Sequence, residues 1–338
     1  MQIFRIVLFP FAVLYDLVTR LRNYFYDKGY FKSTSYPVPV ICVGNLSVGG
    51  TGKSPMIAYL VSLLSSTNDV VVLSRGYGRK TKGYIEVEVS STSKEVGDEP
   101  LQIKKNYPNV RVVVCEDRRT AIEKLKFKAD VILMDDGFQH RKVKPTFNII
   151  LSAFGSLFSA DYLLPTGNLR ESKKGAARAG MIVVTKCPPR VPYATLQQIE
   201  YDLKLQVHQK IFFTTIGYEA NLIGSFETLP LDYLKQKKFT LVTGIAKPAP
   251  LVQFLKEKKF NFTHKNYPDH HEFSDAEISE FKKEELLITT EKDFMRLQPR
   301  LGKFALFYLP IKTQFLNNRS PIFDERIREV VENFKRAE

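Results

Sequence analysis

The sequence predicts an α/β protein: a mostly parallel sheet between two layers of helices, followed by a second, smaller α/β/α domain. Two observations predict this class. Short runs of apolar, often β-branched residues recur along the chain, and helical patterns lie between several of them. Strands that are buried on both faces are apolar at successive positions, and their alternation with helices is typical of a parallel sheet covered on both sides.

The elements follow from this alternation in chain order. The predicted strands span residues 38–43, 70–73, 111–115, 131–134, 147–151, 181–185, 239–243, 286–290 and 304–309. The predicted helices span residues 55–64, 120–125, 194–205, 249–256 and 322–334. We expect residues 212–216 and 224–229 to form a small hairpin instead of a further strand–helix unit.

A domain boundary is expected near residue 150. Residues 151–178 are irregular and rich in Gly, Ser and Lys, and a new strand–helix series begins after them. A chain of 338 residues has room for two domains. The expected parts are an N-terminal helix in residues 1–35, a first domain in 36–150, a second in 151–320 and a C-terminal helix in 321–338.

Composition excludes several classes of protein. The chain is 44% hydrophobic and 25% charged, which excludes a disordered protein, and it has no repeat of the fibrous or solenoid kind. Its three cysteines, Cys42, Cys115 and Cys187, are far apart and lie in or beside apolar runs. We therefore expect buried, reduced thiols in a cytosolic protein, without disulfides or a zinc site.

The chain is strongly basic. Lys and Arg number 50 against 36 Asp and Glu, so the formal charge is 50 − 36 = +14. Such a charge favours one of three partners: nucleic acid, an anionic membrane surface or a phosphorylated substrate. Solubility alone is the alternative explanation.

The N-terminal segment is apolar but short. Residues 3–14 are apolar except for Arg5, and Pro10 interrupts them, whereas a spanning helix needs about 20 apolar residues. Bulky aromatic residues and the lack of a small-residue cleavage site argue against a signal peptide. After Leu14 the pattern becomes amphipathic. It predicts a helix that either lies in a membrane interface or packs on the protein's own core.

The most informative segment is PVICVGNLSVGGTGKSP, residues 39–55, which runs from a strand through a Gly-rich loop into a helix. Glycines let backbone N–H groups surround a phosphate, and the helix start adds partial positive charge. Lys53 is placed to reach the β- and γ-phosphates of a nucleotide, and the Ser54 hydroxyl to bind Mg²⁺. The first domain is therefore predicted to be of the P-loop type. Its predicted nucleotide-binding residues are Ser47, Val48, Gly49, Gly50, Thr51, Gly52, Lys53 and Ser54. Ser47 stands where the strict G-x-x-x-x-G-K-[ST] pattern has Gly.

Two acidic motifs follow the loop. Asp135 and Asp136 end the predicted strand 131–134, and in P-loop proteins a carboxylate at such a strand end holds Mg²⁺. An ordinary turn is the alternative, because Asp-Gly is a common turn dipeptide. The segment VGDEP places Asp98 at a helix start. This carboxylate either caps the helix or helps to deprotonate an acceptor hydroxyl.

Two further motifs carry candidate catalytic groups. The segment YPDHHEF contains His270 and His271, and a neutral histidine beside a carboxylate is a suitable base near neutral pH. Arg170, in LLPTGNLRE, has the shape to clamp a phosphoryl oxygen. Surface histidines and a salt-bridged surface turn are the alternatives.

Taken together, these motifs resemble the tetraacyldisaccharide 4′-kinase family, the lipid A 4′-kinases of Gram-negative bacteria. The matching stretches occur in the family's order and lie within residues 36–295. They are VGNLSVGGTGKSP, SRGYGRK, VGDEP, EDRRTAI, DDGFQHRKV, LLPTGNLRES, VTGIAKP, YPDHHEF and TTEKD. Ser47 in place of the first loop glycine is also similar to the family's own loop. The chain departs from the family at Asn168, where Pro is more familiar, and in a weaker match beyond residue 300, which bears on substrate contacts.

The resemblance implies two α/β/α domains and a membrane-associated N-terminal helix on the cytoplasmic face of the inner membrane. It implies that ATP, with Mg²⁺, phosphorylates the 4′-hydroxyl of tetraacyldisaccharide 1-phosphate, giving lipid IVA. An Asp–His pair would activate that hydroxyl; here it is Asp98 with His270, or less favourably His271. The resemblance also implies Arg118 or Arg119 and Arg170 beside the phosphates. The implied metal ligands are Ser54, Asp135, Asp136 and Glu171.

Two other functions compete with this interpretation. If the chain were a P-loop GTPase or metallochaperone-like switch, we would expect a guanine-reading N-K-x-D segment. The segment TEKD, ending at Asp293, matches this pattern only in part. An ATP-dependent nucleic-acid protein predicts aromatic and basic residues interleaved near the P-loop. The aromatic residues lie at the N-terminus instead. We therefore expect as partners the lipid A precursor and an anionic membrane surface, and no nucleic acid.

Overall fold

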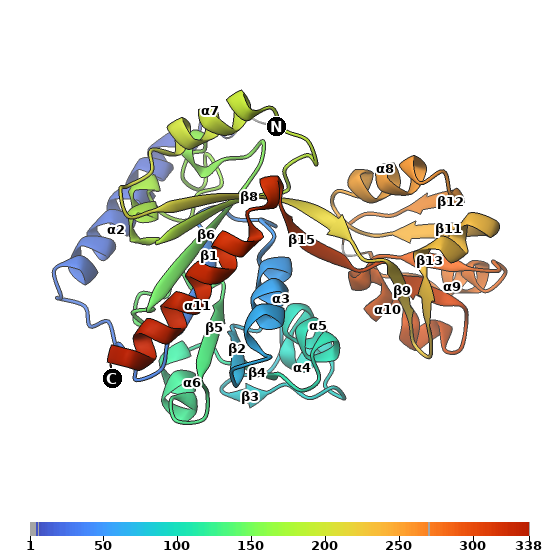
Figure 1. Ribbon diagram of the computed structural model, residues 1–338, viewed down its shortest axis with the longest axis horizontal. Coiled ribbons are helices and arrows are strands. Elements are labelled where there is room, and N and C mark those ends of the chain that lie inside the picture. The colour runs from blue at the N-terminus through green and yellow to red at the C-terminus, as the bar shows by residue number, and fades with distance from the viewer. Residues whose placement is uncertain (1–4, 6, 270, 338) are drawn as a thin grey trace. The chain divides into compact units, whose positions relative to one another are not determined.

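The computed structural model describes residues 5, 7–269 and 271–337 and contains two compact units (Figure 1). Unit 1 comprises the chain up to Ile216 and from Thr313 onward, and unit 2 comprises Gly217–Lys312. The chain passes between the units along two strands, β8 (Lys210–Tyr218) and β15 (Ile311–Phe315). Each unit is built around its own sheet.

Unit 1 contains a nine-stranded sheet in the order β15-β8-β7-β6-β1-β5-β2-β4-β3. Its other strands are β1 (Val40–Asn45), β2 (Val70–Ser74), β3 (Ile85–Glu86), β4 (Arg111–Val114), β5 (Val131–Asp135), β6 (Phe147–Ala153) and β7 (Met181–Thr185). The strands from β8 to β4 pair in parallel, and β3 pairs antiparallel with β4. The carboxyl ends of the central strands therefore meet at one edge, where open α/β sheets bind ligands.

Helices cover both faces of this sheet. They are α2 (Phe9–Asp27), α3 (Lys53–Leu64), α4 (Ser93–Val96), α5 (Asp98–Asn106), α6 (Arg118–Leu125), α7 (Tyr193–Leu203) and α11 (Ser320–Ala337), with 3₁₀ turns at Phe158–Ala160, Lys173–Arg178 and Leu316–Asn318. Successive residues of β1 point to opposite faces. Ile41 packs in a core with α3, α5 and α11, and Cys42 packs in a core with α6 and α7. This confirms the predicted α/β/α arrangement with a mostly parallel sheet.

Unit 2 has a smaller sheet of six strands in the order β10-β9-β14-β13-β11-β12. The strands are β9 (Asn221–Gly224), β10 (Thr228–Pro230), β11 (Lys238–Thr243), β12 (Asn261–Asn266), β13 (Leu287–Thr289) and β14 (Leu306–Tyr308). The helices are α8 (Ala249–Glu257), α9 (Asp275–Phe281) and α10 (Glu291–Leu301), with a 3₁₀ turn at Leu231–Gln236. One core contains α8 and the other contains α9 and α10, so this unit is also an α/β/α sandwich.

The expected boundary near residue 150 differs from this division. Strands β7 and β8 extend the first sheet beside β6, and the C-terminal strand and helix also belong to unit 1. The hairpin expectation was also wrong in part, because residues 212–216 lie in β8, parallel to β7, and the hairpin is β9–β10. A fully buried apolar run predicts a strand, but nothing local in it tells which sheet the strand joins.

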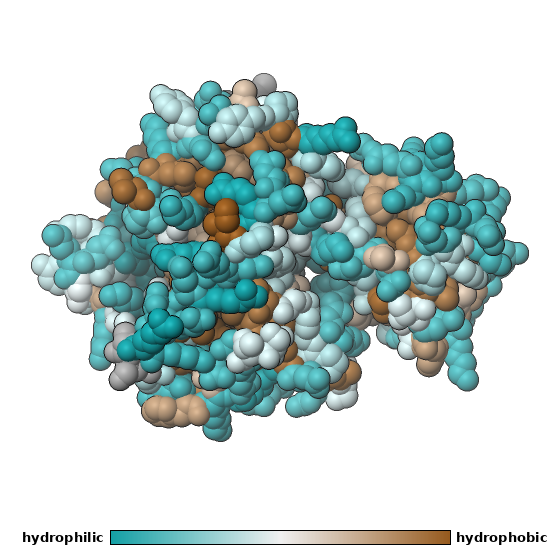
Figure 2. Space-filling model, viewed as in Figure 1, coloured by the Kyte–Doolittle hydropathy of each residue, from teal (hydrophilic) through white to brown (hydrophobic). Residues whose placement is uncertain are grey.

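The N-terminal helix α2 leaves most of its apolar side chains exposed. Among its described residues only Ala12 and Thr19 are buried, although the helix has 19 residues. Its large exposed side chains are Phe9, Phe11, Val13, Leu14, Leu17, Val18, Leu21 and Tyr24. Hydrophilic residues dominate the face drawn in Figure 2, and apolar residues appear on it in separate, small groups. Within the described part of the chain, no helix combines the length and apolarity needed to cross a bilayer.

Candidate active site

The Gly-rich loop between β1 and α3 has the backbone conformation of a phosphate cradle. Gly49 and Gly52 have φ angles of 103° and 88°, in the left-handed region that favours glycine. Helix α3 begins at Lys53, directly after Gly52, and no described side chain caps its first turn. Its first N–H groups therefore remain available for an anion, as the sequence predicted.

Two neighbouring segments hold this loop in place. On one side, Ser47 pairs with Leu169 in an isolated antiparallel bridge, and the N–H of Val48 donates to the carbonyl of Asn168 at 2.7 Å. On the other side, the hydroxyl of Thr185, at the end of β7, donates to the carbonyl of Thr51 at 2.7 Å. The loop is thus fixed at both flanks before any nucleotide binds, which reduces the entropy cost of binding.

Three charged side chains converge at the carboxyl end of β5. The ammonium of Lys53 lies 3.7 Å from a carboxylate oxygen of Asp136, and the guanidinium of Arg170 donates to both oxygens of Asp136 at 3.1 Å. The backbone of Asp136 is itself left-handed, with φ of 47°. The structure thereby brings together the phosphate-loop lysine, the strand-end carboxylate and the arginine that the sequence singled out.

The neighbouring carboxyl group of Asp135 is almost fully buried. Burial, followed by the nearby charges of Glu99 and Asp136, raises the pKa of Asp135 to about 7. The Ser74 hydroxyl lies 3.4 Å from one of its oxygens, and the other oxygen is buried without a hydrogen-bond partner among the described residues. A buried, unpartnered acceptor is costly unless another group satisfies it.

These residues fit Mg²⁺, which the sequence predicts. An unsatisfied carboxylate oxygen and a nearby hydroxyl are the hard oxygen ligands that this ion prefers. The described residues contain no group of three or more His, Cys, Asp or Glu side chains arranged for a metal. Mg²⁺ commonly takes one or two carboxylates and completes its shell with water and phosphate oxygens, so this number is sufficient.

Ser54 carries a contact that the sequence did not predict. Its hydroxyl donates to a carboxylate oxygen of Glu99 at 3.1 Å, although the two residues are 45 positions apart. Glu99 is the second acidic residue of VGDEP, the motif from which the sequence selected Asp98 alone. Glu99 therefore lies beside the expected Mg²⁺ and nucleotide residues.

Asp98 itself lies at the start of α5. It follows Gly97, whose φ is 91° and whose added Cβ would lie 3.0 Å from the carbonyl oxygen of Tyr77. The Asp98 side chain is exposed. A carboxylate in the first turn of a helix is stabilised by the helix dipole, so this position agrees with the helix-start interpretation, and the role of Asp98 as a proton acceptor stays a prediction.

The structure separates the two arginines of EDRR. Arg118 is buried, and the charges of Asp136 and Asp135 act on it, although burial lowers its pKa. Arg119 instead pairs with Asp117 at 2.7 Å, and this hydrogen bonding lowers the pKa of Asp117 to about 2. The guanidinium of Arg118 donates to the carbonyl of Glu116 at 2.9 Å, and of the two candidates Arg118 is the one on which the charges of the acidic strand end act.

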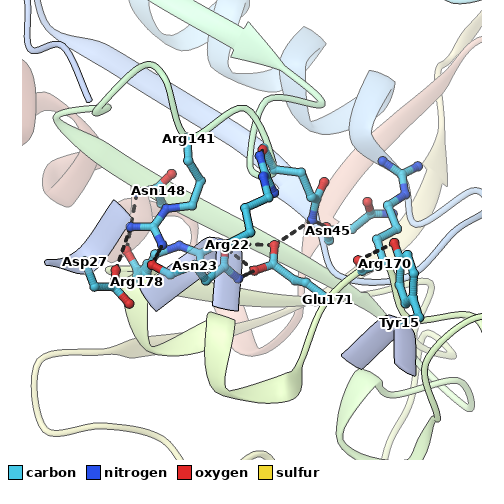
Figure 3. A network of polar contacts seen from close by, with 11 residues as sticks. Tyr15, Arg22, Asn23, Asp27, Asn45, Arg141, Asn148, Arg170, Glu171 and Arg178 are labelled. Carbon is cyan, nitrogen blue, oxygen red and sulfur yellow. Dashed lines mark hydrogen bonds and ion pairs between the residues drawn. The ribbon is translucent and has the colours of Figure 1, made fainter. Parts of the chain in front are cut away.

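Glu171 lies in a buried network of hydrogen bonds (Figure 3). Its carboxylate pairs with Arg178 at 2.9 Å and also accepts from Asn23 at 2.9 Å and from Gln139 at 3.0 Å. Both oxygens therefore already accept hydrogen bonds within the protein. These contacts favour a structural ion pair, and the role of Glu171 as a metal ligand stays a prediction.

Unit 2 gathers three of the sequence motifs at the carboxyl ends of β11, β12 and β13. The buried carboxylate of Asp293, from TTEKD, accepts from the N–H of Gly244 at 2.9 Å, and the N–H of Tyr267 donates to the carbonyl of Thr243 at 2.7 Å. His271 stacks on Tyr267 and contacts Glu277 at 3.0 Å. His270 lies outside the described residues, so its predicted pairing with Asp98 stays a prediction.

Lys186 is a second residue that the sequence analysis missed. It directly follows β7 with a left-handed φ of 58°, and its ammonium donates to the carbonyl of Gly50 at 2.5 Å. A weak sequence signal existed. The segment TKCP, residues 185–188, has the lysine of a base-reading N-K-x-D segment at a strand end but Thr and Pro in place of Asn and Asp.

The chain is similar over nearly its whole length to proteins of one activity. The family model described as LpxK, tetraacyldisaccharide-1-P 4′-kinase, matches residues 4–332. The tetraacyldisaccharide 4′-kinase of Flavobacterium johnsoniae is 43% identical over 99% of this chain and 100% of that protein. The one of Flavobacterium psychrophilum is 45% identical, over 98% of each chain. A crystal structure of LpxK from Aquifex aeolicus, described as an "apo" form in complex with ATP, has a TM-score of 0.80 at 35% identity and covers 97% of this chain and 99% of its own.

Proposed function

Because the chain belongs to the tetraacyldisaccharide-1-P 4′-kinase family, we propose that it phosphorylates the 4′-hydroxyl of tetraacyldisaccharide 1-phosphate with the γ-phosphate of ATP, giving lipid IVA. One observation carries the proposal: Lys53 and Arg170 meet on Asp136 at the end of the Gly-rich loop. This is the arrangement that phosphoryl transfer requires, because catalysis there is mostly positioning and charge stabilisation.

In this proposal the loop N–H groups and Lys53 bind the phosphates of ATP, and Arg170 stabilises the charge that spreads over the transferring group. Arg118, buried at the start of α6, adds positive potential that acts on Asp135 and Asp136. Mg²⁺, held by Ser54, Asp135 and Asp136, would neutralise phosphate charge when bound. Glu99, already bonded to Ser54, keeps that hydroxyl oriented. Asp98 and His270 together act as the general base that activates the acceptor hydroxyl. This role rests on their match to the family's motifs.

The direct test is phosphorylation of tetraacyldisaccharide 1-phosphate in mixed micelles, with ATP and with GTP. We expect one lipid product per ADP released and a preference for ATP. ATP hydrolysis without lipid phosphorylation would mean that the acceptor is wrong. Equal or better turnover with GTP would favour the GTPase alternative.

We also propose that α2 binds an anionic bilayer at the cytoplasmic face of the inner membrane. The support is the row of exposed apolar side chains on α2, together with a net charge of +14. An acceptor with four acyl chains resides in a bilayer, so the enzyme must reach its surface. Amphipathic helices bind such surfaces by apolar burial and by attraction to anionic lipids.

Replacing Leu14 and Leu17 together by Ser is expected to weaken binding to phosphatidylglycerol vesicles roughly a hundredfold. Each leucine side chain contributes about 1.5 kcal/mol on burial, and the two are more than half exposed. Co-sedimentation measures the change. Val207→Ser, an exposed apolar residue of unit 1 outside α2, is the matched control and should bind as the wild type does. Unchanged binding of the double variant would refute the role of α2.

Lys186 is expected to help position the nucleoside. The acidic residues on β5 lie on one side of β1, so a nucleoside that leaves the loop on the other side passes β6 and β7. Lys186→Ala should raise the KM for ATP about tenfold and change kcat less than twofold. The reason is that the lost contact with ATP would be equally strong in the bound substrate and in the transition state. Lys204→Ala is the matched control, because Lys204 also has a left-handed φ, 50°, at the end of α7. An equal KM effect in both variants would contradict the proposal.

A further inference from the structure

Helix α2 is bonded directly to the segments that form the phosphate site (Figure 3). The Tyr15 hydroxyl donates to the carbonyl of Arg170 at 2.8 Å. The guanidinium of Arg22 donates to the carbonyl of Gln139 at 2.8 Å, and the amide of Asn23 donates to the carboxylate of Glu171 at 2.9 Å. The inward face of α2 therefore contacts Gln139, which follows β5, and the adjacent residues Arg170 and Glu171.

Two of these partners, Arg170 and Gln139, contact the Gly-rich segment directly, and Glu171 contacts it through Gln139. The N–H of Arg170 donates to the carbonyl of Leu46 at 2.7 Å, while its guanidinium holds Asp136. The side chain of Gln139 donates to the carbonyl of Asn45 at 2.9 Å, and Asn45 donates in turn to the Thr51 hydroxyl at 2.9 Å. One residue, Arg170, thus lies between Tyr15 of α2 and Asp136, and two residues, Gln139 and Asn45, lie between Arg22 of α2 and Thr51.

Of the contacts between α2 and the site, we expect the hydrogen bond from Asn23 to Glu171 to affect the site most. The Glu171 side chain is 3% exposed, and it accepts from Asn23, Gln139 and Arg178. A buried carboxylate needs all its donors, because water cannot replace a missing one. Asn23 is the only one of the three that belongs to α2. Glu171 directly follows Arg170 in the chain, so its placement also fixes the backbone from which Arg170 extends.

Apolar burial does not hold α2 in this position. Only Ala12 and Thr19 of its described residues are buried, and the apolar side chains face outward. The helix is held mainly by polar contacts, including the pair between Arg141 and Asp27 at 2.6 Å. Segments with few buried apolar contacts open locally at low free-energy cost. A membrane surface that binds the apolar face of α2 would hold its polar face toward the core. It would therefore favour the state in which Tyr15, Arg22 and Asn23 make their hydrogen bonds to the site.

We propose that α2 is a positioning element of the phosphoryl-transfer site, acting through Tyr15 and Asn23 on Arg170 and Glu171, and that an anionic bilayer under its apolar face raises kcat by stabilising this arrangement. The kinetic consequence rests on the proposed function. The mechanical connection does not, because it concerns contacts within unit 1 alone. The two parts are therefore tested by separate measurements.

The kinetic test compares Asn23→Leu, which keeps the side-chain size but removes the donor, with wild type in mixed micelles. We expect kcat to fall about tenfold or more while the KM for ATP changes less than twofold, because a positioning defect acts on the transition state. Tyr15→Phe, which removes only a hydroxyl, should lower kcat less, and Asn23→Gln should restore part of the loss. Arg20→Ala removes the surface pair with Asp16 on the same helix and is the matched control. A kcat for Asn23→Leu within twofold of wild type would overturn the proposal while leaving the proposed function intact.

The mechanical test uses amide hydrogen exchange and needs no acceptor. Phosphatidylglycerol vesicles are expected to slow exchange in α2 and, in wild type, also in residues 168–171. In Asn23→Leu and in Tyr15→Phe the slowing in α2 should persist, and that in residues 168–171 should be reduced. Slower exchange in α2 alone in the wild type would overturn the proposal even if the enzyme makes lipid product. If the wild type shows both effects but makes no product, the proposed function fails and the connection stands.

Discussion

Lys53→Ala is expected to lower kcat/KM for lipid phosphorylation by about a thousandfold or more. Lys53 is the first residue of α3, and its side chain is largely buried. Its ammonium lies 3.7 Å from a carboxylate oxygen of Asp136. Its removal takes away the lysine that directly follows the loop and leaves Arg170, among the described residues, as the cation paired with Asp136. Transferring phosphoryl groups accumulate charge that this ammonium stabilises, so the loss should appear in kcat as well as in KM.

The fold should tolerate this change. Alanine is the strongest helix former, and Lys53 is the first residue of α3, so the variant should unfold near the wild-type temperature. Lys53→Arg keeps the charge but not the shape and should retain partial activity. Lys128→Ala, an exposed lysine before the amino end of β5, is the matched control. A Lys53→Ala protein that folds and retains more than a tenth of wild-type turnover would show that the loop does not bind the reacting phosphates.

Those parts of the fold that rest on local pattern could be predicted. The apolar runs of β1, β2, β4, β5, β6 and β7 and the helices between them are correct, because strands buried on both faces have a distinct composition. Strand β12 was missed because its residues, NFTHKN, lie at a sheet edge and are only partly buried. The sheet that each strand joins was not predictable either, because it depends on contacts between segments far apart in the sequence.

The same distinction holds for the site. The Gly-rich loop and the acidic end of β5 are local motifs, and both were predicted. The contacts of Ser54 with Glu99 and of Lys186 with Gly50 join residues 45 and 136 positions apart, and no local pattern records them. Glu171 shows the opposite case, because its motif suggested a metal ligand whereas its contacts with Arg178, Asn23 and Gln139 depend on the folded structure.

Asp98→Asn is expected to lower kcat by a factor of about 10² to 10⁴, the usual contribution of a general base, while the KM for ATP changes less than threefold. The exchange keeps the size of the side chain and leaves a residue that is favourable near a helix start. Because Asp98 is exposed at the first residue of α5, the loss of its charge should reduce the free energy of unfolding by no more than about 1 kcal/mol. Steady-state kinetics with ATP and lipid varied separately measure the two effects.

Substitutions of two neighbouring carboxylates distinguish a role of Asp98 as proton acceptor from a general effect of removing negative charge. Glu95→Gln removes an exposed acid that caps α4 and should affect stability alone, and Glu99→Gln removes the partner of Ser54 and should alter the dependence on Mg²⁺ and ATP. The pairing with His270 is tested by a double-mutant cycle. If Asp98 and His270 act as one unit, Asp98→Asn combined with His270→Asn should cost little more than the worse single variant. Additive losses would mean that Asp98 and His270 act independently and not as a pair. A defect in the KM for ATP alone would mean that Asp98 binds nucleotide and that another group takes the proton from the 4′-hydroxyl.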